Sequence, residues 1–403
     1  MRMVVTEVGA TLSRESEALL ESVHRFAEDV LRPAGVALDR LADPADVIAP
    51  GSVLWDVFAR YRELGIGYGE IEASDLDAPE RAVLQAAINE ELGWGDSGLA
   101  VSLGVSGFHR IFAQLSGRPE LVERFCRPDS TEIGCWAVTE PDHGSDTLMF
   151  TEDAFRNPDL RANCIATLDK DHYVIRGQKS SWVSNGSIAT VATLFCTIDG
   201  DEGFAGGGVC IVPLDLPGVS RGKPLDKLGQ RGLNQGEIFF DEVRVPAEMM
   251  VVGKDAYGFA VESVLAMANA YMGTAFVGVA RAAFEHALRY AKERVQGGVP
   301  IIRHQSVRGR IFKMFSQVEA ARALSRKVAL MGAAAPPPVQ YSIASKTFCT
   351  TTAFEVASAA VQIYGGNGLS REYPVEKLFR DARASMIEDG CNEVLGLIGA
   401  ARL

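Results

Sequence analysis

Short β-prone runs between about residues 131 and 246, with helical sequence on both sides, most constrain the fold of this chain. The runs at 165–168, 172–175, 191–195 and 208–212 are separated by turns rich in aspartate and glycine, as expected for neighbouring antiparallel strands. Before and after this stretch, apolar residues recur at three- and four-residue steps, which is the spacing of one buried helix face. The sequence therefore predicts an N-terminal helical domain at 1–130, a middle antiparallel β domain at 131–246 and a C-terminal helical bundle at 247–403.

The same periodicity predicts individual helices. An N-terminal stripe at 19–31 should end at Pro33, because proline removes a backbone donor and clashes with the preceding turn. A second stripe at 81–92 should be broken by Gly93, Gly95 and Gly98. In the C-terminal part we expect helices at 276–294, 306–331 and 339–364, and a last helix that begins near Gly390.

Composition excludes several functional classes. The net charge of -12 argues against a nucleic-acid partner, because duplex binding needs a basic face. No apolar run reaches the roughly 18 residues of a membrane span, and the N-terminus does not read as a signal peptide. Seven scattered cysteines, odd in number and never in C-x-x-C spacing, indicate reduced thiols in a cytoplasmic protein. Six histidines in no ligand pattern predict that the protein binds no metal.

Five segments combine glycines with polar or aromatic side chains. Four of them suit a ligand site, and the one at 228–246 helps to identify the fold. The five segments are WAVTEPDHGSD at 136–146, GQKSSWVSNG at 177–186, LGQRGLNQGEIFFDEVRVP at 228–246, YAKERVQGGVPIIRHQ at 290–305, and QIYGGNG at 362–368, which leads to RDAR at 380–383 and EDGCNE at 388–393. Singly, each has an ordinary structural interpretation. Gly365 and Gly366, for example, would cap a helix, and Arg294 would be a favourable charge at a helix C-terminus.

Together, in this order and over nearly the whole chain, the five segments resemble the acyl-CoA dehydrogenase family. The resemblance implies an α+β fold with an N-terminal helical bundle, a middle antiparallel β domain and a C-terminal four-helix bundle. It also implies FAD as cofactor and a reaction that forms an α,β-double bond in an acyl thioester. In that reaction a carboxylate removes the α-proton while the β-hydride passes to the flavin.

The resemblance assigns roles to particular positions. Val138 and Thr139 would bond the pyrimidine end of the flavin, Trp182 would stack beside its ring system, and Ser184 would bond the nitrogen that accepts the hydride. Arg294 would reach the pyrophosphate of a neighbouring subunit's cofactor. The remaining expected cofactor residues are Trp136, Gln305, Gln362, Gly365, Gly366, Cys391 and Glu393, and the expected substrate residues are Ser145 and Gly390.

Asp389 departs from the family pattern, because it stands where the family has its catalytic glutamate. Aspartate is one methylene shorter, and a displacement of about 1 Å can cost on the order of 10²-fold in rate. Three interpretations remain open. Asp389 is the base, or it is only the N-cap of the last helix, or Glu388 acts in its place. The alternative base position of some family members falls near Ala268, which offers no carboxylate, and a nearby family arginine falls on Asn269.

The leading functional prediction is therefore an FAD-dependent acyl-thioester dehydrogenase acting on an acyl-CoA or an acyl-carrier-protein. One alternative is a nitroalkane-oxidase-like enzyme, since Asp389 begins a similar D-G-x-N sequence, although no arginine follows at 394–401. Another is a non-catalytic homologue that binds flavin or an acyl thioester. The resemblance also implies a homodimer or homotetramer, and an electron-transfer flavoprotein is a candidate electron acceptor.

Overall fold

The computed structural model describes residues 12–67, 70–71 and 74–403 of the chain. The N-terminal part is helical, and its helices begin after side-chain caps such as Ser13, Ser52, Asp77 and Asp96. Its helices are α1 (Arg14–Phe26), η1 (Ala27–Leu31), α2 (Arg32–Asp39), α3 (Val53–Glu63), α4 (Ala78–Gly95), α5 (Ser97–Ser106), α6 (Phe108–Leu115) and α7 (Pro119–Phe125).

The prediction that Pro33 ends the first helix was wrong. The chain continues from α1 through one π-helical segment at η1 into α2, where Pro33 lies in the first turn. Proline is tolerated there because the wider π turn changes the local hydrogen-bond pattern. Of the three glycines predicted to break the second stripe, Gly93 lies inside α4, and the helix ends at Gly95. An added Cβ at Gly93 would lie 2.0 Å from the carbonyl oxygen of Ala275, so this glycine lets α4 pack closely on a C-terminal helix.

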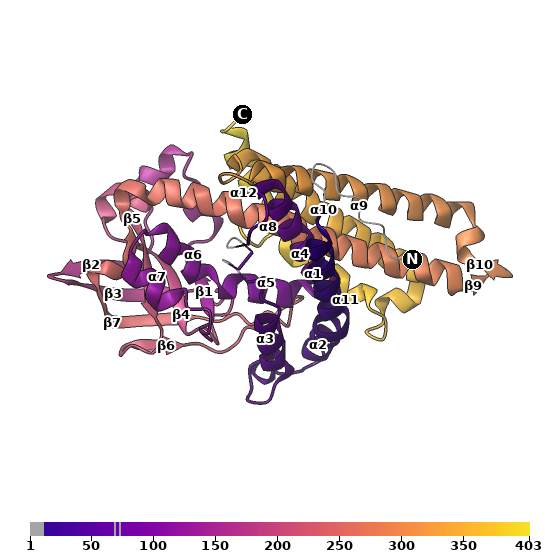
Figure 1. Cartoon of the computed structure of the whole chain (residues 1–403), viewed down its shortest axis with the longest axis horizontal. Coiled ribbons are helices and arrows are strands. Elements are labelled where there is room, and N and C mark those ends of the chain that lie inside the picture. The colour runs from indigo at the N-terminus through magenta and orange to yellow at the C-terminus, as the bar shows by residue number, and fades with distance from the viewer. Residues whose placement is uncertain (1–11, 68–69, 72–73) are drawn as a thin grey trace.

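The middle part is a sheet at one end of the molecule (Figure 1). Its strand order is β6-β7-β3-β2-β4-β5-β8, with β1 paired to β4. The pairings are mainly antiparallel, as predicted, but β4 pairs in parallel with β1 and with one residue of β2. The strands are β1 (Gly134–Ala137), β2 (Ile165–Asp169), β3 (His172–Lys179), β4 (Val191–Thr197), β5 (Gly207–Pro213), β6 (Val219–Arg221), β7 (Ile238–Pro246) and β8 (Met250–Val252).

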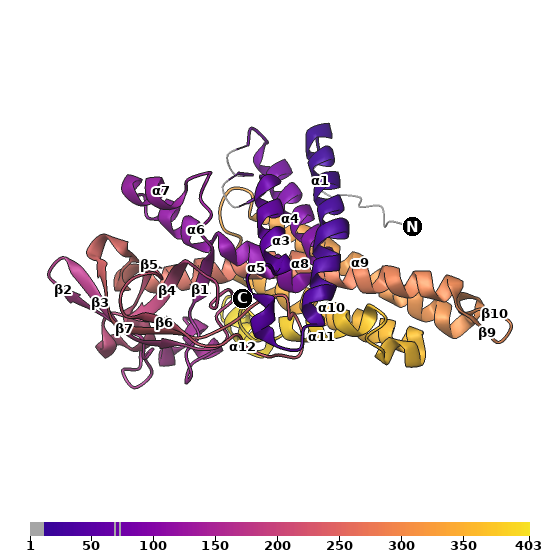
Figure 2. The same cartoon turned by 90° about the horizontal axis from the view of Figure 1, so that it is seen from below.

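Three long helices dominate the C-terminal part and extend away from the sheet to the hairpin of β9 and β10 (Figures 1 and 2). These helices are α8 (Lys254–Glu293), α9 (Gln305–Met331) and α10 (Val339–Tyr364), and they are followed by α11 (Val375–Ser385) and α12 (Asn392–Ala400). The short strands β9 (Val295–Gln296) and β10 (Val299–Pro300) join α8 to α9. The chain thus has the expected α+β class, with helical parts on either side of a central sheet.

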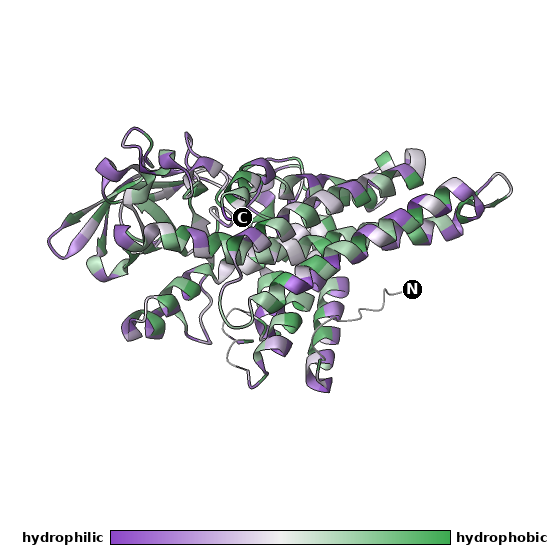
Figure 3. Ribbon diagram, turned by 90° about the horizontal axis from the view of Figure 1, so that it is seen from above, coloured by the Kyte–Doolittle hydropathy of each residue, from purple (hydrophilic) through white to green (hydrophobic). Residues whose placement is uncertain are grey.

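Helix α8 is long and apolar enough to cross a membrane by length and composition alone. However, 72% of its most apolar window is buried inside the protein, by α4, α9 and α10 among others. Figure 3 shows hydrophobic residues gathered where the helices meet. Helix α8 is therefore the central core helix of this fold.

A buried ion network fastens α4 to α8 and α9. Glu90 pairs with Arg281 at 2.9 Å, with Arg322 at 2.8 Å and with Arg326 at 3.0 Å. Glu91 accepts a second bond from Arg281 at 2.6 Å. Burial acts to raise the pKa of Glu90, but the arginine charges outweigh it and lower that pKa to about 2. The network therefore stays fully charged and holds three helices in register.

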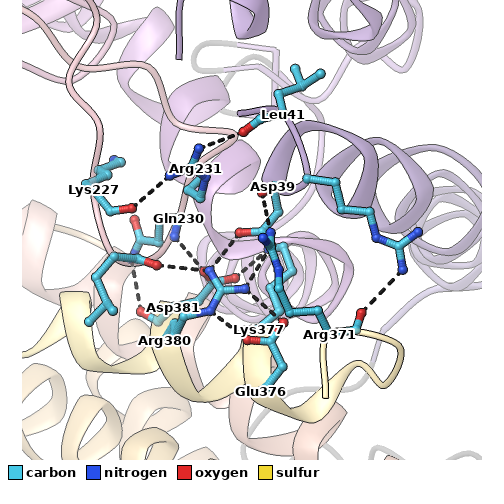
Figure 4. Close-up of polar contacts among 12 residues, drawn as sticks. Asp39, Leu41, Lys227, Gln230, Arg231, Arg371, Glu376, Lys377, Arg380 and Asp381 are labelled. Carbon is cyan, nitrogen blue, oxygen red and sulfur yellow. Dashed lines mark hydrogen bonds and ion pairs between the residues drawn. The ribbon is translucent and has the colours of Figure 1, made fainter. Parts of the chain in front are cut away.

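A second polar cluster joins all three parts of the chain (Figure 4). Asp39 at the end of α2 accepts hydrogen bonds from Arg380 on α11 at 2.8 Å. Lys377 bridges Asp96 and Asp381 at 2.6 Å each. The backbone N–H of Gln230, in the loop between β6 and β7, donates to Asp381 at 2.5 Å. This cluster fixes the position of α11 directly before the segment that carries Asp389.

Candidate active site

A cavity of about 570 Å³ lies between the N-terminal helices and the core helix α8. Helices α3 to α6 supply most of one wall, and α8 supplies Met267, Ala268, Tyr271 and Thr274. Among the residues predicted for the site, Trp136 and Asp389 line this cavity. The cavity is large enough for a small-molecule ligand and has a carboxylate in its wall.

Asp389 lies in a tight loop between α11 and α12. Its φ is +52°, a left-handed conformation that aspartate tolerates better than most residues, and Gly390 follows at φ +92°. The N-cap of α12 is Cys391, so the interpretation of Asp389 as a helix cap was wrong. Asp389 is instead one of the residues that line the cavity.

Two side chains from distant segments hold this loop. The Nζ atom of Lys346, buried on α10, donates to the carbonyl oxygen of Gly390 and to Oδ1 of Asn392, both at 2.8 Å. The backbone N–H of Cys391 donates to Oγ of Ser145 at 3.0 Å. Ser145, predicted to bind substrate, therefore lies directly beside Gly390 and Cys391, two other predicted site residues.

The loop has an electrostatic environment suited to proton transfer. Burial, reinforced by the neighbouring charge of Glu388 and opposed by Lys346, raises the pKa of Asp389 to about 7. Burial lowers the pKa of Lys346 to about 8, although the charge of Asp389 opposes that change. A carboxylate with a pKa near neutrality can take up and release a proton at physiological pH.

Glu388, the third candidate base, is engaged elsewhere. Its Oε2 accepts a hydrogen bond from Nε2 of Gln230 at 2.8 Å. Burial raises the pKa of Glu388, and Lys227 opposes this. Glu388 is not among the described residues that line the cavity, whereas Asp389 is. The geometry therefore favours Asp389.

The predicted flavin-ring residues gather where β1 and β3 end. The backbone N–H of Ser180 donates to the carbonyl oxygen of Thr139 at 2.8 Å, so the segment after β1 runs beside the segment after β3. A buried ion pair below them, Lys179 with Glu140 at 2.6 Å, locks the two segments together, and Lys179 also donates to the carbonyl oxygen of Val138 at 3.0 Å.

Trp182 and Ser184 lie on the next loop. The Trp182 side chain is 55% exposed, and its carbonyl oxygen accepts a bond from Nε2 of Gln235 at 3.0 Å. Ser184 pairs with Gln235 through an isolated β-bridge. An exposed indole on a loop held by backbone contacts offers a flat apolar face to a ligand.

A second group of predicted cofactor residues lies at the far end of the long helices. Arg294 ends α8, Gln305 begins α9, and Gln362 with Gly365 ends α10. Tyr290 stacks on Tyr364 with ring centroids 4.0 Å apart, which brings the ends of α8 and α10 together. The exposed residues of this group are Arg294, Gln305, Gln362, Gly365 and Gly366. Figures 1 and 2 show this end, beside β9 and β10, opposite the sheet.

Comparison with known proteins identifies the fold. The sequence models of the acyl-CoA dehydrogenase middle domain and C-terminal domain match residues 135–243 and 258–403. The cyclohex-1-ene-1-carbonyl-CoA dehydrogenase of Geobacter metallireducens is 31% identical, with 96% of this chain and 97% of that relative aligned. This chain belongs to the acyl-CoA dehydrogenase family.

Solved structures agree with the family assignment. The butyryl-CoA dehydrogenase of Megasphaera elsdenii superposes with a TM-score of 0.85 at 28% identity, over 98% of this chain and 99% of its own. A structure described as an electron transferring flavoprotein of Acidaminococcus fermentans contains a chain with a TM-score of 0.84 at 26% identity, over 98% of each. Acyl-CoA dehydrogenases are FAD flavoproteins that act on CH–CH groups.

The residues present fit such a cofactor. The exposed face of Trp182 is available for stacking, and Nε1 of Trp136 is buried with no hydrogen-bond partner in the described part of the chain. A buried donor without a partner in the cavity wall is expected where a bound ligand supplies the missing acceptor. Residues 12–67, 70–71 and 74–403 contain no group of three or more His, Cys, Asp or Glu that could hold a metal ion.

Sequence reasoning missed Lys346. The available signal was its position on the buried stripe of α10, with Ser342, Cys349 and Ala353 one turn before it and one and two turns after it. A lysine among buried positions needs acceptors to compensate its charge. The acceptors lie in a segment 44 residues away in the sequence. The periodicity of α10 gives no information about that contact.

Proposed function

We propose that this protein is an FAD-dependent acyl-CoA dehydrogenase in which Asp389 removes the α-proton of the thioester. The observation that carries the proposal is the position of Asp389 in the cavity wall, with its pKa raised to about 7. A base with that pKa is ionised often enough to act and basic enough to take a proton from carbon. The fixed loop, held by Lys346 and Ser145, compensates for the shorter aspartate by placing its backbone.

The cofactor site is proposed from the two residue groups described above. Val138, Thr139, Trp182 and Ser184 would hold the ring system near the cavity, with Trp136, Cys391 and Glu393 nearby. Bound FAD supplies the acceptor for the β-hydride. Two observations support this arrangement. Trp136 on β1 and Asp389 after α11 line the same cavity, and the segment after β3 is hydrogen-bonded to the segment after β1.

The second group supports a homodimer or a homotetramer. Arg294, Gln305, Gln362, Gly365 and Gly366 lie at the ends of α8, α9 and α10. The ends of α8 and α9 adjoin β9 and β10, whereas Trp182 follows β3 of the sheet at the other end of the molecule (Figure 1). One chain cannot bring both groups to one FAD, but an isologous pairing of two chains can. Arg294 of one copy would then meet the pyrophosphate of the other copy's cofactor, where a guanidinium fork matches phosphate oxygens.

The thioester arm is proposed to pass Ser145 and Gly390. The Ser145 oxygen accepts from Cys391, which leaves its own hydrogen free to donate to a substrate acceptor. Coenzyme A and a carrier protein present the same arm, and the named relatives act on CoA thioesters, which favours CoA. An electron-transfer flavoprotein is the proposed acceptor, in line with the similar chain found in such a structure.

The same relatives make the nitroalkane-oxidase-like and non-catalytic alternatives less favoured. A cytoplasmic location is proposed because all seven cysteines are unpaired and five of them are buried.

The test is anaerobic mixing of the purified holoprotein with short, medium and branched acyl-CoA thioesters while the flavin absorbance is recorded. We expect bleaching with at least one thioester, and loss of bleaching in Asp389→Asn. Bound flavin that no acyl-CoA bleaches would exclude this function.

A further inference from the structure

The cavity continues beyond the base along α4, and this extension contains amide side chains. Gln85 and Asn89 are one helical turn apart on α4, and both line the cavity that contains Asp389. Nε2 of Gln85 donates to Oδ1 of Asn89 at 3.1 Å, so the two amides form a pair. Asn89 is only 8% exposed.

The amide pair keeps unused hydrogen-bonding capacity. Within the described residues, the side-chain hydrogen bonds of the pair are limited to the one between them: Nδ2 of Asn89 donates to no acceptor and Oε1 of Gln85 accepts from no donor. The pair therefore presents to the cavity a donor and an acceptor side by side. A group that both donates and accepts, such as a hydroxyl or a primary amide, would satisfy both at once.

Other cavity-lining groups have similar capacity. The Tyr61 hydroxyl has no hydrogen-bond partner among the described residues, and burial raises its pKa, so it remains a neutral donor. Nε of Arg110 is buried and also lacks a partner in the described part of the chain. A plain alkyl chain that filled this space would remove water from these groups and return no hydrogen bond.

The charged groups of the wall balance one another. The described residues of the wall include three arginines, Arg62, Arg81 and Arg110, and three carboxylate side chains, Glu70, Glu132 and Asp389. These described residues give no excess positive charge for a carboxylate on the acyl tail, which favours a neutral polar group.

We propose that Gln85 and Asn89 recognise a neutral hydrogen-bonding group, a hydroxyl or a primary amide, on the acyl tail of the thioester substrate. This rests on the proposed acyl-CoA dehydrogenase function, since the acyl group must enter this cavity for Asp389 to reach its α-carbon. The two amides are specificity-determining residues and do not touch the reacting atoms.

The test compares two thioesters of equal length that differ in one atom, ω-hydroxyvaleryl-CoA and hexanoyl-CoA. Binding is measured by anaerobic calorimetry on the Asp389→Asn holoprotein, in which turnover of the ligands is slowed, and kcat/KM is measured on the parent enzyme. We expect the hydroxylated thioester to bind at least about tenfold more tightly, because a site built for a hydroxyl discriminates strongly against its absence.

Amide variants test whether Gln85 and Asn89 cause the preference for the hydroxylated thioester. Asn89→Leu and, as a second variant at a less buried position, Gln85→Met should each reduce the preference to less than about threefold. Gln114→Met, an amide change on the exposed side of α6, should leave the preference unchanged. Thermal melting identifies any variant that fails to fold. If one amide variant fails to fold, the preference measured in the other amide variant tests the inference.

The outcomes separate the two proposals. Three outcomes would overturn this inference and leave the dehydrogenase proposal intact. Hexanoyl-CoA could bind as tightly as the hydroxylated thioester or more tightly, or glutaryl-CoA could bind more tightly than the hydroxylated thioester. The third outcome is a preference for the hydroxylated thioester that survives both amide variants. Failure of every acyl-CoA to bind or to bleach the flavin overturns both.

Discussion

The Nζ atom of Lys346 lies 2.8 Å from the carbonyl oxygen of Gly390. This contact joins the middle of α10 to the residue after Asp389, and the same ammonium group bonds Asn392 at 2.8 Å. The loop that carries the proposed base is thus held by a buried cation, and the same charge opposes the rise in the pKa of Asp389.

Replacing that cation should change both the position and the pKa of the base. In Lys346→Met we expect the rate of flavin bleaching by acyl-CoA to fall by about 10²-fold, because the loop loses two anchors. The midpoint of the pH profile should also move above its parent value, since a positive charge beside Asp389 is lost. Stopped-flow absorbance across pH measures both. Lys313→Met, on the exposed face of α9, is the matched control and should change neither.

The reaction itself should depend on ionisation of Asp389. Because the pKa of Asp389 is raised to about 7, kcat/KM should rise as the pH increases toward about 7 and then level off. Asp389→Asn should reduce the rate by about 10²- to 10⁴-fold, whereas Asp159→Asn, at an exposed position, should not. A rate in Asp389→Asn close to that of the parent would assign the base elsewhere.

Stability should depend on pH through the same residue. The folded-state pKa of Asp389 is raised from 3.8 to about 7, so the acid form is favoured by folding and ionisation opposes it. The advantage of the acid form is complete below pH 3.8 and is lost as the pH rises through about 7. The Tm of Asp389→Asn should therefore match the parent at low pH and exceed it increasingly up to about pH 7. A difference in Tm that does not vary with pH would contradict the raised pKa.

The buried network on α4 should dominate thermodynamic stability. Glu90→Gln removes the buried carboxylate that Arg281, Arg322 and Arg326 share, and we expect a loss of about 3–5 kcal/mol in the free energy of unfolding. Asp56→Asn removes an exposed ion pair with Arg60 and should cost less than about 1 kcal/mol. Chemical denaturation of both variants measures the contrast, and equal losses would mean that the network contributes little.

Cofactor retention tests the proposed contribution of a second copy. Arg294→Ala removes a guanidinium from the far end of α8, and we expect FAD to be released at least about tenfold faster on dilution. Flavin fluorescence follows the release, and light scattering reports the oligomeric state. Arg14→Ala, exposed on α1, should retain FAD as the parent does. If Arg294→Ala retained FAD as the parent does, Arg294 would not contribute to cofactor binding.

Local sequence predicted the elements better than the contacts between them. The expected helix at 339–364 coincides with α10, and the β-prone runs at 172–175 and 191–195 lie within β3 and β4, because side-chain periodicity and turn residues are local properties. Pro33 was misjudged because a π turn can absorb a proline, and nothing in residues 19–33 reports such a turn.

The site depends on contacts that no local pattern contains. Ser145 and Cys391 are 246 residues apart in sequence, and Asp39 and Arg380 are 341 residues apart. The family resemblance placed Asp389 and Ser145 in one site, but the left-handed conformation of Asp389 and its support by Lys346 are visible only in three dimensions.

Helix α8 sets the distance between the cavity and Arg294. Its residues Met267 to Thr274 line the substrate cavity, and Arg294 follows its last turn. At a rise of 1.5 Å per residue, Met267 and Arg294 are separated by about 40 Å along one unbroken rod. One residue inserted between Thr274 and Arg294 would rotate the far end by about 100° and carry Arg294 off its face. If Arg294 binds the cofactor of a second copy as proposed, the length of α8 between Thr274 and Arg294 is fixed more strictly than its side chains are.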